Sequence, residues 1–121
     1  MILLDTNALI WLETGHARSR VLVQVRGGLR ISPASLLELQ FLLELGRLRM
    51  KTSISDLAED SRWIVDEPPV LPWFEEAFGL TWTRDPFDRL IVAHALSRGW
   101  KLATGDVNIL EHLDRRHALA L

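Results

Sequence analysis

Four acidic residues, spread over the chain, lie beside apolar segments where carboxylates are unusual. Asp5 directly follows the short apolar run Ile2–Leu4, and Asp106 comes shortly after another such run. Glu38 and Asp88 fall on the apolar sides of two expected helices. A buried carboxylate is costly unless a metal ion, a cation or a proton neutralises it. The pattern therefore indicates chemistry that depends on a metal ion or on acid–base groups.

Helical geometry places two of these acids on apolar faces. At about 100° per residue, Glu38 lies opposite the polar edge of the helix expected over Pro33–Leu45. Asp88 lies on the apolar side of the helix expected over Pro86–Arg98. Each acid also has a purely structural interpretation: Glu38 can reach water at the rim of its face, and Asp88 suits the positive end of the helix dipole. Asp85, which precedes a proline, is expected first as an N-cap and second as a further acid of the site.

The expected elements bring the four acids to one edge of a sheet. Helices that follow parallel strands begin at the carboxyl ends of those strands, where ligands bind in open α/β sheets. Four carboxylates gathered there repel one another unless a divalent cation is present. The chain has no cysteine, and its four histidines show no ligand spacing, so oxygen donors favour Mg²⁺ or Mn²⁺ over zinc. Such a cation lowers the pKa of a bound water and stabilises charge on a phosphate.

Short apolar segments alternate with helical segments along the whole chain. Proline and glycine mark the boundaries: Pro33 and Pro86 stand at helix starts, and Gly46 and Gly99 follow helix ends. This alternation predicts an α/β fold in which a mostly parallel central sheet carries helices on both faces. The expected strands are Ile2–Leu4, Leu29–Ile31, Val70–Leu71, Lys101–Thr104 and Ala118–Leu121. The expected helices are Ala8–Leu12, with Thr6 or Asn7 as its cap, Ser19–Arg26, Pro33–Leu45, Ser53–Val65, Pro72–Phe78, Pro86–Arg98 and Val107–His112.

Composition limits the classes of protein that this chain can represent. Its 121 residues are expected to form one domain over 1–121, and 48% hydrophobic with 25% charged residues excludes wholesale disorder. The net charge of −2 excludes a protein that grips nucleic acid by bulk charge. No secretory signal is evident, and the longest apolar run, Ala8–Leu12, is far too short for a membrane span. A cytoplasmic protein is therefore expected.

Four segments of the chain resemble motifs of PIN-domain ribonucleases. They are Leu3–Asn7, Ile31–Leu39, Arg84–Ile91 and Leu102–Asp106, and the third is similar to a segment common in bacterial VapC-type toxins. The likeness covers nearly the whole chain, in order and at suitable spacing. It implies a PIN-like three-layer fold and a divalent-metal-dependent endoribonuclease, the toxin of a type II toxin–antitoxin pair. RNA would then be the substrate, and a cognate antitoxin protein would be a partner.

The resemblance also implies roles for individual residues. Carried over by position, Asp5, Glu38, Asp88 and Asp106 are the catalytic acids that hold Mg²⁺ or Mn²⁺. Gly105 departs from the pattern, because many relatives carry a larger and often basic residue there, which leaves open how the substrate backbone is held. The supporting residues would be Thr6, Asn7, Asp85, Thr104 and Asn108.

Two other classes of protein compete with the nuclease interpretation. An aspartyl phosphotransferase or phosphatase would use Asp5 as its nucleophile, but such sites generally want a second early acid or a well-placed lysine. Asn7 and a chain whose only lysines are Lys51 and Lys101 argue against it. A catalytically silent binding module with the same fold would be signalled by loss of one or more acids, and all four are present.

Apolar and aromatic residues complete the expectations. The Pro33–Leu45 helix is apolar over most of its circumference, more than a domain of this size easily buries, so a homodimer is expected. His94 is expected on a helix surface. The five tryptophans are expected to pack in the core or in interfaces rather than to stack on bases.

Overall fold

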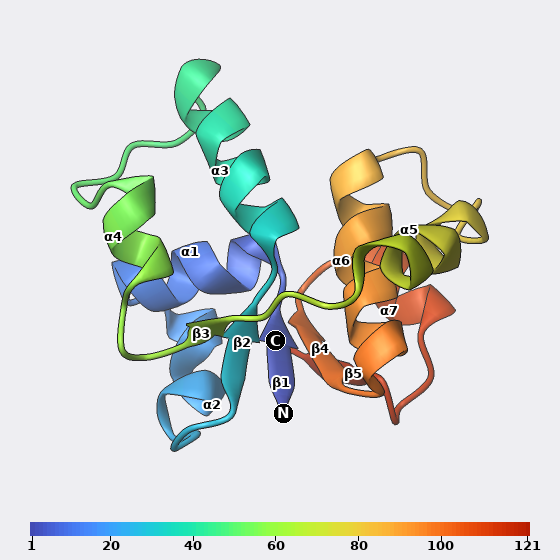
Figure 1. Cartoon of the computed structure of the whole chain (residues 1–121). Coiled ribbons are helices and arrows are strands. Elements are labelled where there is room, and N and C mark those ends of the chain that lie inside the picture. Colours follow the sequence, from blue (N-terminus) through green and yellow to red (C-terminus); the bar gives the residue numbers. More distant parts are fainter.

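Five short strands form one parallel sheet at the centre of the molecule (Figure 1). The computed structural model describes all residues, 1–121. The strand order is β3-β2-β1-β4-β5, and every neighbouring pair is parallel. The mostly parallel sheet predicted from the sequence is therefore confirmed, with β1 at its centre. The strands are β1 (Ile2–Leu4), β2 (Leu29–Ile31), β3 (Ile64–Val65), β4 (Lys101–Thr104) and β5 (Ala118–Ala120).

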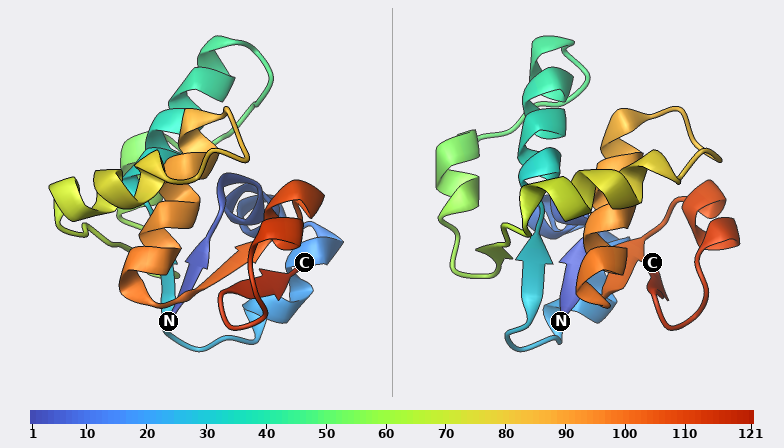
Figure 2. Two further views of the ribbon diagram at one scale, coloured as in Figure 1. Left: turned by 90° about the vertical axis from the view of Figure 1, so that its right-hand side faces the viewer. Right: turned by 45° about the vertical axis from the view of Figure 1, so that its right-hand side comes forward.

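Helices cover both faces of this sheet, which confirms the three-layer α/β architecture (Figure 2). One side carries α1, α2 and α4, and the other carries α5, α6 and α7 (Figure 1). No helix is both long enough and apolar enough to cross a membrane. The helices are α1 (Thr6–Thr14), the 3-10 helix η1 (Ala17–Ser19), α2 (Arg20–Val23), α3 (Pro33–Glu44), α4 (Ile54–Ala58), α5 (Val70–Phe78), α6 (Pro86–Arg98) and α7 (Val107–His112).

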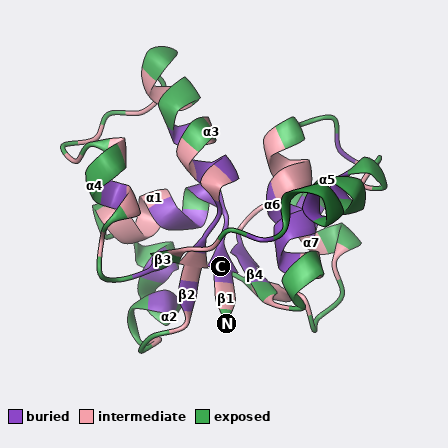
Figure 3. Ribbon diagram, in the orientation of Figure 1, coloured by how far each residue is buried: buried purple, intermediate pink, exposed green.

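Two hydrophobic clusters pack against the two faces of the sheet. Leu3 and Leu102 belong to the cluster beneath α5 and α6, whereas Leu4 and Ala103 belong to the cluster beneath α1 and α4. This division follows from the strand itself, because successive side chains point to opposite faces. Burial is concentrated in the strands and in the helix sides that face them, and the far end of α3 is exposed (Figure 3). The two clusters hold β1 and β4 rigidly between two layers of helices.

The third strand lies elsewhere than the sequence suggested. Ile64–Val65, expected at the end of a helix, forms β3 and pairs with β2. Trp63 is buried and its Nε1 donates to the Leu57 carbonyl at 2.8 Å, which turns the chain sharply after α4. Val70–Leu71, expected as a strand, is instead exposed at the start of α5, after two prolines. The third strand therefore forms at Ile64–Val65 because these β-branched residues pair with β2 in the folded protein.

His94 is fully buried, which corrects its expected place on a helix surface. Its Nε2 lies 2.7 Å from Asp66 Oδ2, and its ring packs 5.2 Å from that of Trp73. Arg98 also donates to Asp66, at 2.9 Å. Asp66 follows β3 directly, so the strand missed in the sequence is what supplies the acceptor for this buried imidazole.

Candidate active site

Asp5 and Asp106 leave the sheet side by side at its carboxyl edge. Asp5 follows β1 and caps α1: its Oδ1 accepts from Ala8 N at 2.7 Å, so the cap is Asp5 and not Thr6 or Asn7. Asp106 follows β4 and caps α7, with Oδ1 accepting from Asn108 N at 2.8 Å. Because β1 and β4 are parallel neighbours, both carboxylates emerge on the same edge.

Glu38 and Asp88 come to the same place on two packed helices. Phe41 on α3 and Phe87 on α6 lie with ring centroids 5.7 Å apart, so the third turn of α3 adjoins the first turn of α6. Glu38 precedes Phe41 by three residues, and Asp88 directly follows Phe87. Asp85 caps α6, with Oδ1 accepting from Phe87 N at 2.8 Å and from Asp88 N at 3.2 Å, as expected for an N-cap.

The five acids share one electrostatic environment. The pKa of Asp88 is raised to about 7, first by burial and then by the negative charges of the other four. These four are Asp85, Glu38, Asp106 and Asp5, in decreasing order of effect. The structure therefore brings together the acids that sequence reasoning selected on four separate segments.

The pKa values of Asp5 and Glu38 are raised for the same reasons. Burial is the main cause for Asp5, whose pKa is about 6, and the charge of Asp106 adds to it, while the Thr104 hydroxyl opposes it. Burial also raises the pKa of Glu38, followed by the charges of Asp85 and Asp5. Carboxylates this strongly disfavoured in their charged form favour a proton or a cation beside them.

The acids do not by themselves enclose an ion. No three acidic or histidine side chains lie at the mutual spacing of a formed metal site. The donor chemistry nevertheless suits a hard divalent cation, because the side chains offer carboxylate and hydroxyl oxygens only. Two buried hydroxyls, Thr6 Oγ1 and Ser35 Oγ, have no hydrogen-bond partner in the protein. Thr6 lies close enough to Glu38 to lower its pKa, yet outside ordinary hydrogen-bond geometry.

The expected supporting residues fall into two groups. Thr6 and Thr104 are buried beside the acids, and Thr104 Oγ1 accepts from Asp106 N at 3.0 Å. Asn7 and Asn108 are exposed, and neither amide side chain has a partner in the protein. Thr104 therefore fixes the backbone of Asp106, Thr6 keeps an unpartnered hydroxyl beside the acids, and the asparagines present free polar groups near the same edge.

Arg18 is a residue of this edge that sequence reasoning missed. Its charge lowers the pKa of Asp5, and its guanidinium lies 4.4 Å from the Trp11 ring centroid. It comes from η1, 87 positions before Gly105, whose carbonyl it approaches. The one sequence signal was Gly105 itself, where the absence of a side chain leaves room for a group from elsewhere.

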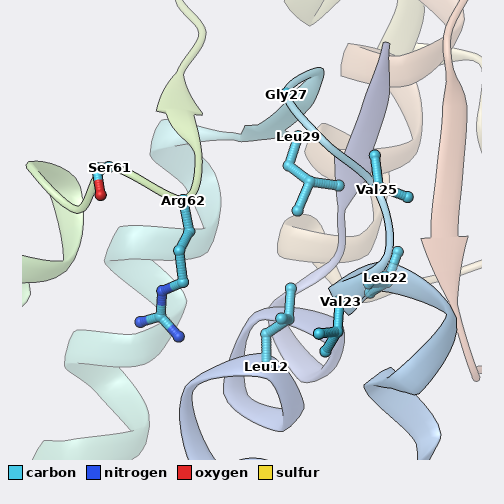
Figure 4. Close-up of a pocket in the computed structure, with 8 residues that line it drawn as sticks. All are labelled: Leu12, Leu22, Val23, Val25, Gly27, Leu29, Ser61 and Arg62. Atoms are coloured by element: carbon cyan, nitrogen blue, oxygen red, sulfur yellow. The ribbon is translucent and has the colours of Figure 1, made fainter.

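An apolar pocket of about 340 Å³ lies away from the acids, between α1, α2 and β2 (Figure 4). Its walls are mostly aliphatic, with the Arg62 side chain on one side. None of the five acids lines it, so it is not part of the acidic site. The lining residues are Leu12, Leu22, Val23, Val25, Gly27, Leu29, Ser61 and Arg62.

Comparison with known proteins identifies the family. The PIN domain model matches residues 2–115, and the chain belongs to the PIN domain family. A chain of a toxin–antitoxin complex from Klebsiella pneumoniae has a similar fold, with a TM-score of 0.71 and 17% identity over 99% of this chain and 97% of that one. A chain of VapBC2 from Rickettsia felis, bound to a promoter DNA fragment, gives a TM-score of 0.70 and 19% identity over 100% and 99%. VapBC-1 from nontypeable Haemophilus influenzae gives 0.68 and 23% over 99% and 98%. No curated protein matches in sequence.

Proposed function

We propose that this protein is a Mg²⁺-dependent endoribonuclease that hydrolyses RNA phosphodiester bonds and acts as the toxin of a toxin–antitoxin pair. The observation that supports the proposal most is the environment of Asp88, whose pKa is raised to about 7 by burial and by the charges of four other acids, three of them on other segments of the chain. Membership of the PIN domain family supports nuclease chemistry. Perturbed carboxyls gathered at the edge of a parallel sheet are typical of a catalytic centre.

The acids of the site are proposed to share metal binding and to differ in their further roles. Asp5, Asp88 and Asp106, with Glu38, would hold Mg²⁺ or Mn²⁺, which supplies a water of lowered pKa and offsets negative charge on the phosphate. Glu38 would orient the attacking water or a second ion. Thr104 keeps Asp106 in place through its backbone N–H. Asp85 fixes the first turn of α6, and with it the position of Asp88.

The exposed surface of α3 and the likeness to solved structures support two kinds of protein partner. Large apolar side chains are 46% to 64% exposed on α3 and at its C-cap: Leu37, Phe41 and Leu45. Such a face supports a homodimer, because isolated soluble domains rarely expose contiguous apolar surface. The structural neighbours are toxin–antitoxin complexes, which supports an antitoxin as a second partner. We place the protein, as one PIN domain over 1–121, in the cytoplasm, where the proposed substrate lies.

The activity is tested on purified protein with a labelled single-stranded RNA of mixed sequence. We expect internal cleavage with Mg²⁺ or Mn²⁺, none in EDTA, and recovery when excess metal is restored. Sequencing the 5′ ends of the fragments then gives the cleavage preference. Cleavage that persists unchanged in EDTA, with contaminating nuclease excluded, contradicts the metal mechanism. Absence of cleavage with intact antitoxin binding indicates the silent module, and metal-stimulated hydrolysis of a small phosphate ester alone indicates the phosphotransferase class.

A further inference from the structure

Arg18 reaches the acidic site from outside the sheet and is held there by three contacts. Its Nη2 donates to the backbone oxygen of Leu121 at 2.7 Å and lies 3.5 Å from the Gly105 carbonyl. Its guanidinium lies over Trp11, 4.4 Å from the ring centroid. Contact with an aromatic face restrains the plane of a guanidinium while leaving its edges open to hydrogen bonding. Arg18 is thus a fixed cation beside β4 and β5.

Gly105 provides the space that Arg18 occupies. A Cβ at this position would lie 2.5 Å from Arg18 Nη2 and 2.7 Å from Trp11 Cη2. Gly105 is not among the glycines with positive φ, so its backbone does not require glycine. Glycine is needed here because the side chains of Arg18 and Trp11 come too close to leave room for a Cβ. Since Gly105 directly precedes Asp106, this approach places a guanidinium at the margin of the acidic site.

Most N–H donors of Arg18 have no partner in the protein. No Asp or Glu side chain forms a salt bridge with Arg18, although it is the one cation that lowers the pKa of Asp5. Both hydrogen bonds use Nη2, so Nε and Nη1 have no acceptor in the protein. By contrast, Arg89 on α6 already donates Nε to the Thr83 carbonyl at 2.8 Å. Arg18 therefore offers the N–H groups of Nε and Nη1 as separate donors, one on each side of the engaged Nη2.

We propose that Arg18, whose guanidinium occupies the space left by Gly105, binds a non-bridging phosphate oxygen of the RNA strand that enters the acidic site. The inference rests on the proposed ribonuclease function and names the group that holds its substrate. A chain of net charge −2 lacks bulk attraction for a polyanion, so local cations must position the backbone. A guanidinium N–H donates a strong, charge-assisted hydrogen bond to a phosphate oxygen.

The test measures RNA binding separately from cleavage. In an Asp88→Asn background, which stops cleavage, Arg18→Gln is compared with Arg20→Gln, a nearby exposed arginine whose side chain has no polar partner in the protein. The probe is a fluorescein-labelled single-stranded RNA, and anisotropy is recorded over a series of salt concentrations. Arg18→Gln should weaken binding about tenfold and reduce the slope of log K against log salt by about 0.7, the value for one phosphate contact on a single strand. Arg20→Gln should change neither by as much as twofold.

A second variant tests the space argument. Gly105→Ala should displace the Arg18 guanidinium and weaken RNA binding, but should add little in the Arg18→Gln background, because the contact is already lost. With Asp88 intact, Arg18→Gln should raise KM more than it lowers kcat. If wild type cleaves RNA while Arg18→Gln retains the affinity and salt slope of Arg20→Gln, the role of Arg18 is disproved and the nuclease proposal stands. If wild type neither binds nor cleaves RNA, both proposals fail.

Discussion

Asp5 and Asp106 perform the same structural task on adjacent strands: each ends its strand and caps the next helix with Oδ1. The capping distances are 2.7 Å to Ala8 N and 2.8 Å to Asn108 N. Capping uses Oδ1 of each carboxylate, and no protein hydrogen bond to either Oδ2 meets ordinary geometric limits. The same two aspartates therefore begin two helices and provide two acids of the site.

Two substitutions at Asp106 distinguish its role as a helix cap from its role as a charged site acid. Asp106→Asn keeps a capping oxygen and removes the charge, whereas Asp106→Ala removes both. The alanine variant should be less stable than the asparagine variant by about 1 kcal/mol in the free energy of unfolding. Urea melts without metal measure this difference, and both variants should lose RNA cleavage. An asparagine variant that cleaves at the wild-type rate would remove Asp106 from the catalytic set.

Asp88 should make metal-free stability depend on pH. Its pKa is raised to about 7 in the folded protein, so the stability linked to its proton is present at low pH and is lost as pH rises from its unfolded value through about 7. Asp88→Asn, which resembles the protonated acid, should match wild type at acidic pH. Above pH 7 it should be more stable by roughly 1–3 kcal/mol, allowing for solvent screening.

The comparison of two melts at each pH isolates Asp88 from other groups. His94 acts in the opposite direction, because burial lowers its pKa and its contribution is lost as pH falls. It is present in both proteins and cancels in the difference. Asp56→Asn, which removes an exposed helical charge, is the control. A difference between wild type and Asp88→Asn that does not change with pH would contradict the electrostatic account of the site.

Divalent metal should stabilise the folded protein most at neutral to alkaline pH. Mg²⁺ or Mn²⁺ relieves repulsion among Asp5, Glu38, Asp88 and Asp106, so melting temperature should rise with metal concentration. The gain is about 2.7 kcal/mol when free metal is about one hundred times its Kd. It should shrink sharply in Asp106→Asn and persist in Asp56→Asn. Equal stabilisation of all three proteins would show that the metal binds elsewhere.

Assembly provides a prediction that does not depend on catalysis. Phe41 is 46% exposed on α3, and Val23 is 67% exposed on α2. If α3 carries the homodimer interface, Phe41→Glu should yield a monomer in light scattering, while Val23→Glu should leave the dimer intact. A wild-type protein that is monomeric at micromolar concentration would disprove the dimer.

Most of the fold was predictable because local and tertiary signals agree along much of the chain. Pro33 and Pro86 begin helices where expected, and the apolar runs around Leu3 and Leu102 form central strands. The third strand was missed because Ile64–Val65 is only two residues long and is selected by pairing with β2. No local pattern carries that information.

The candidate site was predictable for its acids and not for its cation. The acids stand where apolar residues are expected, and this is how Glu38 and Asp88 can be recognised on the apolar faces of their helices. Arg18 is an exposed residue of η1, where an arginine is ordinary, so the sequence gives no sign of its role. Only the folded structure brings its guanidinium to the site. His94 was misplaced for a related reason: its partner, Asp66, lies 28 positions away on an unrecognised strand end.

The central claim is that carboxylates on four separate segments form one metal-dependent ribonuclease centre. Single-turnover cleavage of RNA with saturating Mg²⁺, measured in parallel for wild type, Asp88→Asn, Asp85→Asn and Asp56→Asn, tests it most directly. Asp88→Asn should fold normally and lose at least about 100-fold in rate, because it removes a charge that the metal needs. Asp85→Asn, which preserves the cap, should keep measurable activity, and Asp56→Asn should cleave like wild type. Normal cleavage by Asp88→Asn would contradict the account.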